Sequence, residues 1–558
     1  MGESDRTEAE AAVVERPHVI LSRRRRWVVT AGILLGMFLA ALEATVVGTA
    51  MPTIIASLGG LDRYSWVFSA FLLASTVTVP VWGRLSDLYG RRALYLIGVT
   101  LFLAGSALSG ASQSITHLIV FRAVQGLGAG ALIPLSLTIN GDIFTMSERA
   151  RIQGLFSGVW GLASILGPLV GGIITDQFSW RWVFYINIPF GLAAAVVVGV
   201  ALKEPKREGR PVIDYAGALW MTISVSLLLV ALVETGTSPG WTSPVLFLPA
   251  AGAVIFGALF IHAERRAKEP IMPLSIFRNR MVSASSATSF LVGAAMFGAI
   301  TFIPLFVQGT LGGTASQAGS VLTPLLLGRV SLAIVGGRLM LKVGYRPTVI
   351  AGLAVLALGF AILSQFGAGT PRWLLLADMA LIGSGMGLVV LALLITVQNS
   401  VERDQLGIAT SLNQFSRSIG GAVGVAVMGA VLSISLNLHL AEIQQSSDLP
   451  PAEVAAVVHN PSAMIDPGAR AALPATLLKS MQSAMSGALH NVFLVGALLA
   501  GLALVSGFWL PARYTGTKEI PVEQPLHTAT SARECEQLLM AEMTTLDAEH
   551  EPVAVEGD

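Results

Sequence analysis

Long apolar runs are the feature of this 558-residue chain that most constrains its fold. A helix of about 20 apolar residues spans the hydrocarbon core of a bilayer, and its backbone satisfies its own hydrogen bonds there. The composition agrees, because only 12% of the residues are charged and the mean hydropathy is +0.70. The sequence therefore predicts an all-α integral membrane protein. We place fourteen spans near residues 27–51, 65–83, 93–110, 116–140, 153–175, 183–202, 214–235, 244–264, 284–308, 317–336, 348–366, 374–397, 407–434 and 489–511.

The basic residues predict the orientation of these spans. An even number of spans puts both termini on one side, and most of the 35 Lys and Arg residues fall on that side. Loops rich in Lys and Arg stay in the cytoplasm, so both termini are predicted to be cytoplasmic. The first run, from Trp27, is too long for the apolar part of a cleaved signal peptide. We expect the plasma membrane, and for a bacterium the inner membrane, to hold this multi-pass chain.

A charged, glycine-rich turn occurs twice. Residues 83–92 read Gly-Arg-Leu-Ser-Asp-Leu-Tyr-Gly-Arg-Arg, and residues 337–346 read Gly-Arg-Leu-Met-Leu-Lys-Val-Gly-Tyr-Arg. Glycine lets two helix ends turn back tightly, and Asp87 is expected to pair with basic side chains and close the cytoplasmic face. Chance likeness in turn composition is the alternative explanation of the second copy. The residues of this predicted gate are Gly83, Asp87, Gly90, Arg91 and Arg92.

The spacing of the two turns predicts the domain organisation. They follow the second and tenth spans, so two spans are inserted between two six-helix bundles. Residues 435–488 are predicted to form an extracellular insertion between the last two spans. Asp466-Pro467 and Pro474 within it are typical helix starts, so the last helix is expected to begin outside the membrane. The predicted parts are an amino-terminal cytoplasmic segment (1–26), the first bundle (27–202), the linkers and inserted helices (203–283), the second bundle (284–511, with the insertion at 435–488) and a cytoplasmic tail (512–558).

Ionisable residues inside the spans are candidate functional residues. A charge near the centre of a bilayer costs roughly 2.5 to 3.5 kcal/mol on insertion scales, so it normally faces a partner or a cavity. Glu43 and Arg122 lie deep in the first and fourth spans, whereas Glu234 lies almost at the outer end of the seventh. Asp378 and Arg417 are secondary candidates, and for Arg417 a structural hydrogen-bonding role is equally open.

Glu43 is the predicted proton-coupling carboxyl. Burial disfavours the charged form of a carboxyl, and a nearby cation favours it, so a change in the position of Arg122 could set when a proton leaves. The alternative is a permanent ion pair that holds the bundle together, although buried pairs are weak evidence for stability.

Besides the repeated turn, several motifs follow one another along the spans. They are residues 42–52 in the first span, residues 122–130 with their Arg-x-x-Gln-Gly pattern, and residues 180–189. The fifth span carries a further motif, made of Gly158, Gly161, Gly167, Pro168, Gly171 and Gly172. Together these motifs resemble the fourteen-helix drug:proton antiporter branch of the major facilitator superfamily, and the motif of the fifth span resembles the segment that marks exporters in that family.

The resemblance implies a major-facilitator-type fold and proton-coupled export of amphipathic drugs or other small hydrophobic compounds by alternating access. A dedicated exporter of an endogenous lipid or metabolite is the alternative on the same scaffold. Glu43 stands where the branch usually has Asp, and the tenth span contains Arg329 instead of an extra acidic residue, which puts a preference for multiply charged cations in doubt. The predicted cavity residues are Thr45, Gln125, Trp160 and Asn413.

Other functional classes receive little support. The eight histidines lie mainly in tails and loops, and the single cysteine, Cys535, lies in the polar tail, so the sequence suggests no metal site and no enzyme. A receptor would not require the duplicated gate motif. The net charge of +1 argues against a nucleic-acid partner. We expect no cofactor, a monomer in membrane lipids, and protons and a small amphipathic substrate as partners.

Overall fold

The computed structural model describes residues 21–144, 146–202, 215–234, 244–267, 270, 272, 274–401, 405–446 and 467–511. Within these ranges the chain forms helices and no strands. Thirteen of the described helices are long and apolar enough to cross a membrane. A shorter apolar helix, Ala216–Leu232, coincides with the seventh predicted span. The predicted all-α membrane fold is confirmed, while the count of fourteen spans stays a prediction.

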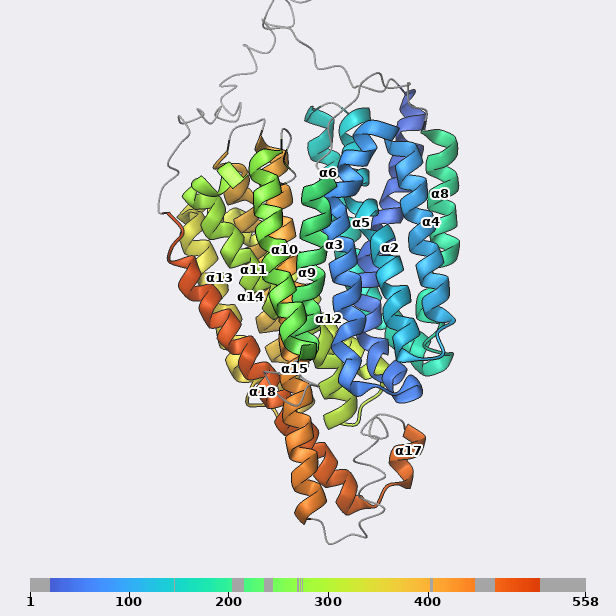
Figure 1. Cartoon of the computed structure of the whole chain (residues 1–558), viewed down its shortest axis with the longest axis vertical. Helices are drawn as coiled ribbons and strands as arrows, with labels where there is room; N and C mark the ends of the chain where they lie inside the picture. The colour runs from blue at the N-terminus through green and yellow to red at the C-terminus, as the bar shows by residue number, and fades with distance from the viewer. Residues whose placement is uncertain are drawn as a thin grey trace, which may run out of the picture. The chain divides into compact units, whose positions relative to one another are not determined.

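The amino-terminal half places α5 and α2 at the centre of its packing. Helix α5 lies against α3 and α4, whereas α2 packs on α6 and α8 (Figure 1). The predicted span 183–202 is divided at Ile186 into two helices, so Asn187 becomes the first residue of the second one. The helices of this half are α2 (Arg23–Leu58), α3 (Tyr64–Tyr89), α4 (Arg91–Gly110), α5 (Ile115–Ile143), α6 (Met146–Gln177), α7 (Trp182–Tyr185) and α8 (Asn187–Ala201), with a 3-10 turn η1 (Leu61–Arg63).

The carboxy-terminal half repeats this packing pattern. Helix α14 lies against α12 and α13, as α5 does against α3 and α4, and α11 packs on α15 and α18, as α2 does on α6 and α8. The repeated contacts support the internal duplication indicated by the two turn motifs. The elements are η2 (Leu274–Arg278), α11 (Arg280–Leu305), the π-helical turn η3 (Phe306–Thr310), α12 (Ala315–Val343), α13 (Tyr345–Leu363), α14 (Arg372–Gln398), α15 (Leu406–Ser446), α17 (Pro467–Ala472) and α18 (Ala475–Gly507).

Two further helices have no counterpart in this repeat. Helix α9 (Tyr215–Glu234) packs along α10 (Pro244–Arg266) and contacts α3 and α15. Large apolar side chains of α10 such as Phe247, Leu248 and Val254 are exposed. An apolar exposed face of a membrane helix suits contact with lipid tails. The inserted pair therefore lies at the periphery of the two bundles.

Helix α15 extends further than predicted, whereas α18 begins at the helix start that the sequence predicts. Helix α15 continues from the predicted end at residue 434 to Ser446, and α18 begins at Ala475, immediately after Pro474. A helix of 41 residues is about 60 Å long, twice the roughly 30 Å hydrocarbon thickness. Leu436 and Leu440 of α15 are buried in the same apolar cluster as Leu477 of α18. The predicted span ends at residue 434 because it follows the apolar run, whereas α15 and its packing against α18 continue beyond that run.

Both copies of the charged turn use glycine in the same way. Gly90 joins α3 to α4 with a φ of 87°, and Gly344 joins α12 to α13 with a φ of 90°. An L side chain rarely adopts such a φ together with an extended ψ. The predicted tight reversal of two helix ends is thus present in each half, at equivalent positions of the motif.

Replacing either turn glycine is expected to destabilise the protein. Gly90→Ala and Gly344→Ala should each cost about 1–3 kcal/mol, because a side chain strains the backbone there. Thermal unfolding followed by fluorescence-detected size exclusion measures the effect. Gly83→Ala is the matched control from the same motif, since a Cβ at Gly83 meets no atom within 4 Å. Equal stability of all three variants would contradict the strain argument.

Candidate functional site

Glu43 and Arg122 form an ion pair deep inside the amino-terminal half. Glu43 is on α2 and Arg122 is on α5, and Nη1 of Arg122 donates to Oε1 of Glu43. Each residue is only 1% exposed. Two opposite charges removed from water in this way must neutralise each other, because an isolated buried charge is very costly. The structure therefore brings together the two residues that the sequence selects as principal candidates.

Three neutral polar residues complete a buried network around this pair. Nη1 of Arg122 also donates to Oε1 of Gln125 at 2.8 Å, and Nε2 of Gln125 donates to Oγ of Ser106 at 3.2 Å. Nδ2 of Asn187 donates to Oε2 of Glu43 at 2.7 Å and to Oγ of Ser106 at 3.0 Å. Both carboxylate oxygens of Glu43 thus accept hydrogen bonds from uncharged or cationic donors.

The helices place these groups by simple geometry. Arg122 and Gln125 are three residues apart on α5, which puts them on one face. Ser106 comes from α4, and the break at Ile186 puts Asn187 at the start of α8. The Phe71 ring of α3 lies 4.0 Å from Cζ of Arg122, so a cation–π contact covers the guanidinium. Five helices of this half therefore meet at one charged pair.

The secondary candidates lie in the other half and do not join this network. Asp378 of α14 is 3% exposed, and neither of its carboxylate oxygens has a hydrogen-bond partner among the described residues. Arg417 of α15 is partly buried, and its Nη2 donates to Oε1 of Gln414. The charges of the carboxy-terminal half are thus arranged differently from those of the amino-terminal half.

The predicted cavity residues do not converge on one place. Gln125 belongs to the Glu43 network, while Asn413 donates to Oγ of Ser289 at 2.8 Å in the other half. Thr45 bonds to the backbone of its own helix and faces α6. Trp160 packs against the two largest apolar clusters.

The glycine-rich motif of α6 permits two close helix contacts. A Cβ on Gly171 would lie 2.6 Å from Oγ1 of Thr49 on α2, and one on Gly172 would lie 2.6 Å from Cα of Ser316 on α12. Either position therefore excludes a larger residue without movement of a helix. Pro168 lies inside α6, and its carbonyl faces Gly319 of α12. Gly158 has open space, so its place in the motif has no packing explanation here.

The gate motif forms an ion pair that the sequence analysis did not foresee. Nε of Arg91 lies 2.7 Å from Oδ2 of Asp142, the penultimate residue of α5. Nη1 of Arg91 also donates to the Ser86 carbonyl at 3.3 Å. The side chain of Asp87 lies outside the described side chains, so its predicted pairing stays a prediction. Arg91 nevertheless ties the α3–α4 turn to the end of α5.

A set of contacts joins the two halves at the end where α2 terminates and α12 begins; we call them the closing contacts. Nε2 of Gln308 donates to the Thr49 carbonyl at 2.9 Å, and the Tyr64 hydroxyl donates to the Thr301 carbonyl at 2.7 Å. The carboxylate of Asp176 accepts the backbone N–H groups of Ala315 and Ser316 at 3.1 and 2.8 Å. Asp176 of one half thereby satisfies the first N–H groups of α12 in the other half.

At the opposite end, the described contacts join helices of the same half. Arg26 pairs with Glu148 at 3.0 Å, and Asn279 donates to the Ser400 carbonyl at 2.6 Å. The halves are therefore connected through the closing contacts rather than through these pairs.

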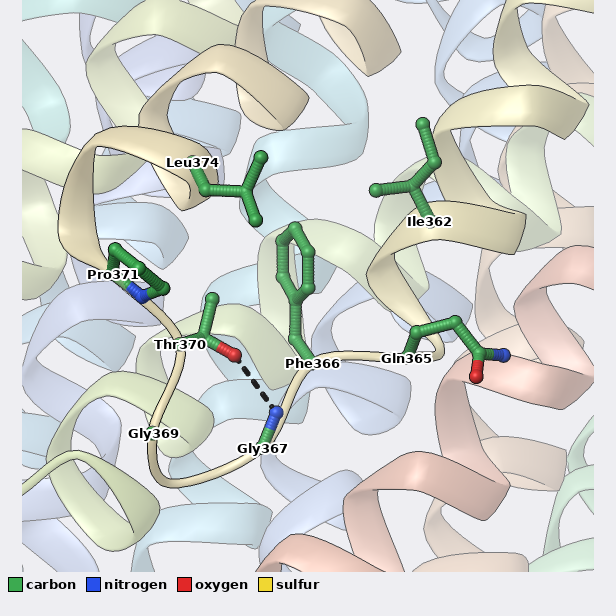
Figure 2. A pocket seen from close by; sticks show the side chains of 8 residues that line it. All are labelled: Ile362, Gln365, Phe366, Gly367, Gly369, Thr370, Pro371 and Leu374. Carbon is green, nitrogen blue, oxygen red and sulfur yellow. Dashed lines mark hydrogen bonds between the residues drawn. The ribbon is translucent and has the colours of Figure 1, made fainter.

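An open, apolar pocket lies at the turn between α13 and α14. Figure 2 shows Phe366 and Leu374 directed into it, with the Gly367 N–H donating to Oγ1 of Thr370 at 2.9 Å. No charged residue lines this pocket. It offers no group for proton transfer or ion binding, and the Glu43 network has no residue in it.

Sequence reasoning missed Ser106, Asn187, Asp142 and Asp176 as individual positions. Asn187 lies within the 180–189 motif, and an amide inside the predicted span 183–202 was the available signal. Asp142 and Asp176 lie just outside the predicted spans, where an acidic residue is unremarkable without its partner. Only the packing of distant helices identifies these partners.

The comparisons with known proteins agree with this fold. The family model of the Major Facilitator Superfamily matches residues 33–425. The multidrug transporter protein MdtP of Bacillus subtilis (strain 168) is 37% identical over 527 residues, which is 91% of this chain and 97% of that protein. Multidrug resistance protein 3 of the same strain is 36% identical, with 88% of this chain and 96% of that protein covered.

A solved structure also resembles the whole helical arrangement. It is the inward-facing, unoccupied form of a bacterial homologue of the human lysosomal transporter Spinster, with a TM-score of 0.60 at 15% identity. The match covers 88% of this chain and 98% of that one. At this identity the likeness shows the fold alone. The chain belongs to the Major Facilitator Superfamily, in its multidrug efflux family, and is therefore a multi-pass membrane transporter rather than an enzyme.

Breaking the buried pair from one side is expected to destabilise the protein more than removing both charges. Arg122→Gln leaves Glu43 without its cation and should cost about 3–5 kcal/mol. The double variant Glu43→Gln/Arg122→Gln should recover most of that loss, because no uncompensated charge remains. Unfolding in detergent, measured for both single variants and the double variant, gives the coupling. Additive losses would show that the two residues do not depend on each other.

Proposed function

We propose that this protein is a proton-driven antiporter that exports small amphipathic compounds by alternating access. The observation that carries the proposal is the fully buried Glu43–Arg122 pair on two helices of one half. Names of the relatives support efflux of drugs. The coupling to protons rests on the chemistry of the pair.

Protonation of Glu43 changes the balance of this network. It removes the negative charge that neutralises Arg122, so the attraction that holds α2 and α5 at this point is lost. A proton can shift a conformational equilibrium only if the two states interact with it differently. A carboxyl that is paired with Arg122 in one state and separated from it in the other meets this condition. Glu43 then binds a proton from one side and releases it to the other.

The closing contacts support an inward-facing arrangement. Basic residues predict that the end where α2 terminates is extracellular. Gln308, Tyr64 and Asp176 then close the outer side. Export requires these contacts to break, so that the halves separate outside and meet at the cytoplasmic side. The close approach of α6 and α12 at Gly172 is the point about which we expect them to move.

Cellular placement follows from the same arguments. We propose that the protein works as a monomer in the plasma membrane, with both termini in the cytoplasm. The proton gradient supplies the energy, and no cofactor or metal takes part. Among the described residues, no group of three or more His, Cys, Asp or Glu side chains is arranged for a metal ion.

Glu43→Gln should abolish efflux driven by a pH gradient in proteoliposomes. The amide resembles a permanently protonated carboxyl and cannot release a proton, whereas Glu43→Asp should retain activity because it keeps the acid. Glu234→Gln at the end of α9 is the control and should transport substantially, since this residue lies outside the two repeated bundles. Full pH-driven transport by Glu43→Gln would refute the assignment, and equal loss in Glu234→Gln would place Glu234 on the proton path.

Asp176→Ala should shift the protein toward an outward-facing state. The variant loses the carboxylate that accepts two N–H groups of α12. In the proposed cycle these two hydrogen bonds form only while the outer side is closed. Spin labels at Gln113→Cys and Arg372→Cys, on a Cys535→Ser background, report the separation of the halves. We expect a larger population of long distances. Asp62→Ala is the control, because Asp62 pairs with Arg63 in its own half. Unchanged distance distributions would argue against the closing role.

A further inference from the structure

Two arginines of the carboxy-terminal half, from α12 and α15, contact one face of α11. Nη1 of Arg329, from α12, is 3.8 Å from Sδ of Met296 on α11. The backbone of Arg417, from α15, packs directly against Gly293, which is three residues before Met296 on α11. Because Gly293 and Met296 share a face of α11, the two arginines approach the same surface of that helix. Both residues are partly exposed rather than enclosed.

Neither arginine has an anionic partner in the part of the chain that the structure describes. Among the described residues, the guanidinium of Arg329 donates only to the Met296 sulfur, and that of Arg417 donates only to its neighbour Gln414. The contrast with Arg122 is clear, because that guanidinium is neutralised by Glu43. Two like charges at membrane depth raise each other's energy, and an anion between them would lower the energy of both.

Arg329 lies next to a contact between α12 and α6 of the other half. Val330, which follows Arg329, lies 3.6 Å from the Cβ position of Gly161 on α6. Trp160, the residue before Gly161, packs against the apolar cluster that contains Met296. Arg329 thus lies beside the interface of the two halves, where an alternating-access transporter exposes its substrate first to one side and then to the other.

We propose that Arg329 and Arg417 bind the anionic group of an amphipathic substrate, a carboxylate or a phosphate, while its apolar part packs on Met296 and Trp160. A planar guanidinium donates two parallel hydrogen bonds to such groups, which suits both oxoanions. The inference rests on the proposed export function and names its substrate class. It separates the roles of the halves, with the proton on Glu43 and the substrate charge on the arginines.

Equilibrium binding without a proton gradient tests this site. The full-length protein in nanodiscs of zwitterionic lipid is titrated with radiolabelled laurate and with dodecyltrimethylammonium, which carry the same apolar chain and opposite charges. Empty nanodiscs give the amount that partitions into lipid. We expect laurate to bind the wild-type protein at least tenfold more tightly than the cation. Arg329→Gln and Arg417→Gln should each weaken laurate binding about tenfold, which corresponds to about 1.4 kcal/mol.

Matched variants and a lipid arm sharpen the result. Arg266→Gln, an exposed arginine at the end of α10, should leave laurate binding unchanged. Arg329→Lys and Arg417→Lys should retain part of the affinity, because the charge remains. Discs that contain phosphatidylglycerol distinguish the source of the anion: loss of laurate binding there would assign the site to a lipid headgroup, and retained binding to a free amphiphile. Both outcomes support an anion site.

Equal binding of the two probes to the wild-type protein would overturn the inference, even if a variant fails to fold. Unchanged laurate affinity in a folded Arg329→Gln/Arg417→Gln variant would overturn it as well. Neither result touches the proton-coupling proposal, which is judged by pH-driven efflux in Glu43→Gln. A failure of proton coupling with intact laurate binding would leave the arginine site in place and remove only the driving force.

Discussion

The buried ion pair between Glu43 and Arg122 is the interaction on which the amino-terminal half depends. Two charges that are each 1% exposed are tolerated because they neutralise each other and have polar partners. Asn187, Gln125 and Ser106 supply those partners from helices that are far apart in the sequence. The network therefore fixes how α2, α4, α5 and α8 meet. In the proposed mechanism, protonation of Glu43 alters this meeting.

The two halves repeat one packing pattern but differ in their charges. The amino-terminal half balances its deep cation with a carboxylate, whereas the other half contains Arg329 and Arg417 without a described anionic partner and a buried Asp378 without a hydrogen bond. Identical backbone frameworks thus carry different electrostatic environments. This asymmetry suits a transporter in which one half handles the coupling ion and the other contributes to substrate recognition, because the two ligands then act on different helices of a shared interface.

Movement between the halves is constrained by small residues and by caps. At Gly172 the backbone of α6 approaches α12 so closely that a methyl group would clash, and Asp176 accepts the first N–H groups of α12 one turn further on. The first contact permits two helices to pivot at short range. The second is a polar link that water or another donor can replace when the halves separate. Close apolar packing and exchangeable polar contacts at the same end allow the two halves to meet there without a permanent connection.

The sequence by itself determined the membrane class, the positions of the apolar helices, the turn glycines and the two principal charged residues. These follow from local physics. A long apolar run is costly in water, the positive φ at Gly90 and Gly344 is costly for any residue with a side chain, and a charge inside a span is costly without a partner. Only the tertiary structure decided that Asn187 and Ser106 join Glu43, that Arg91 pairs with Asp142, and that α15 continues to Ser446 against α18. Each of these depends on which helices pack together, and an isolated Asn, Asp or polar helix end carries no record of its distant partner.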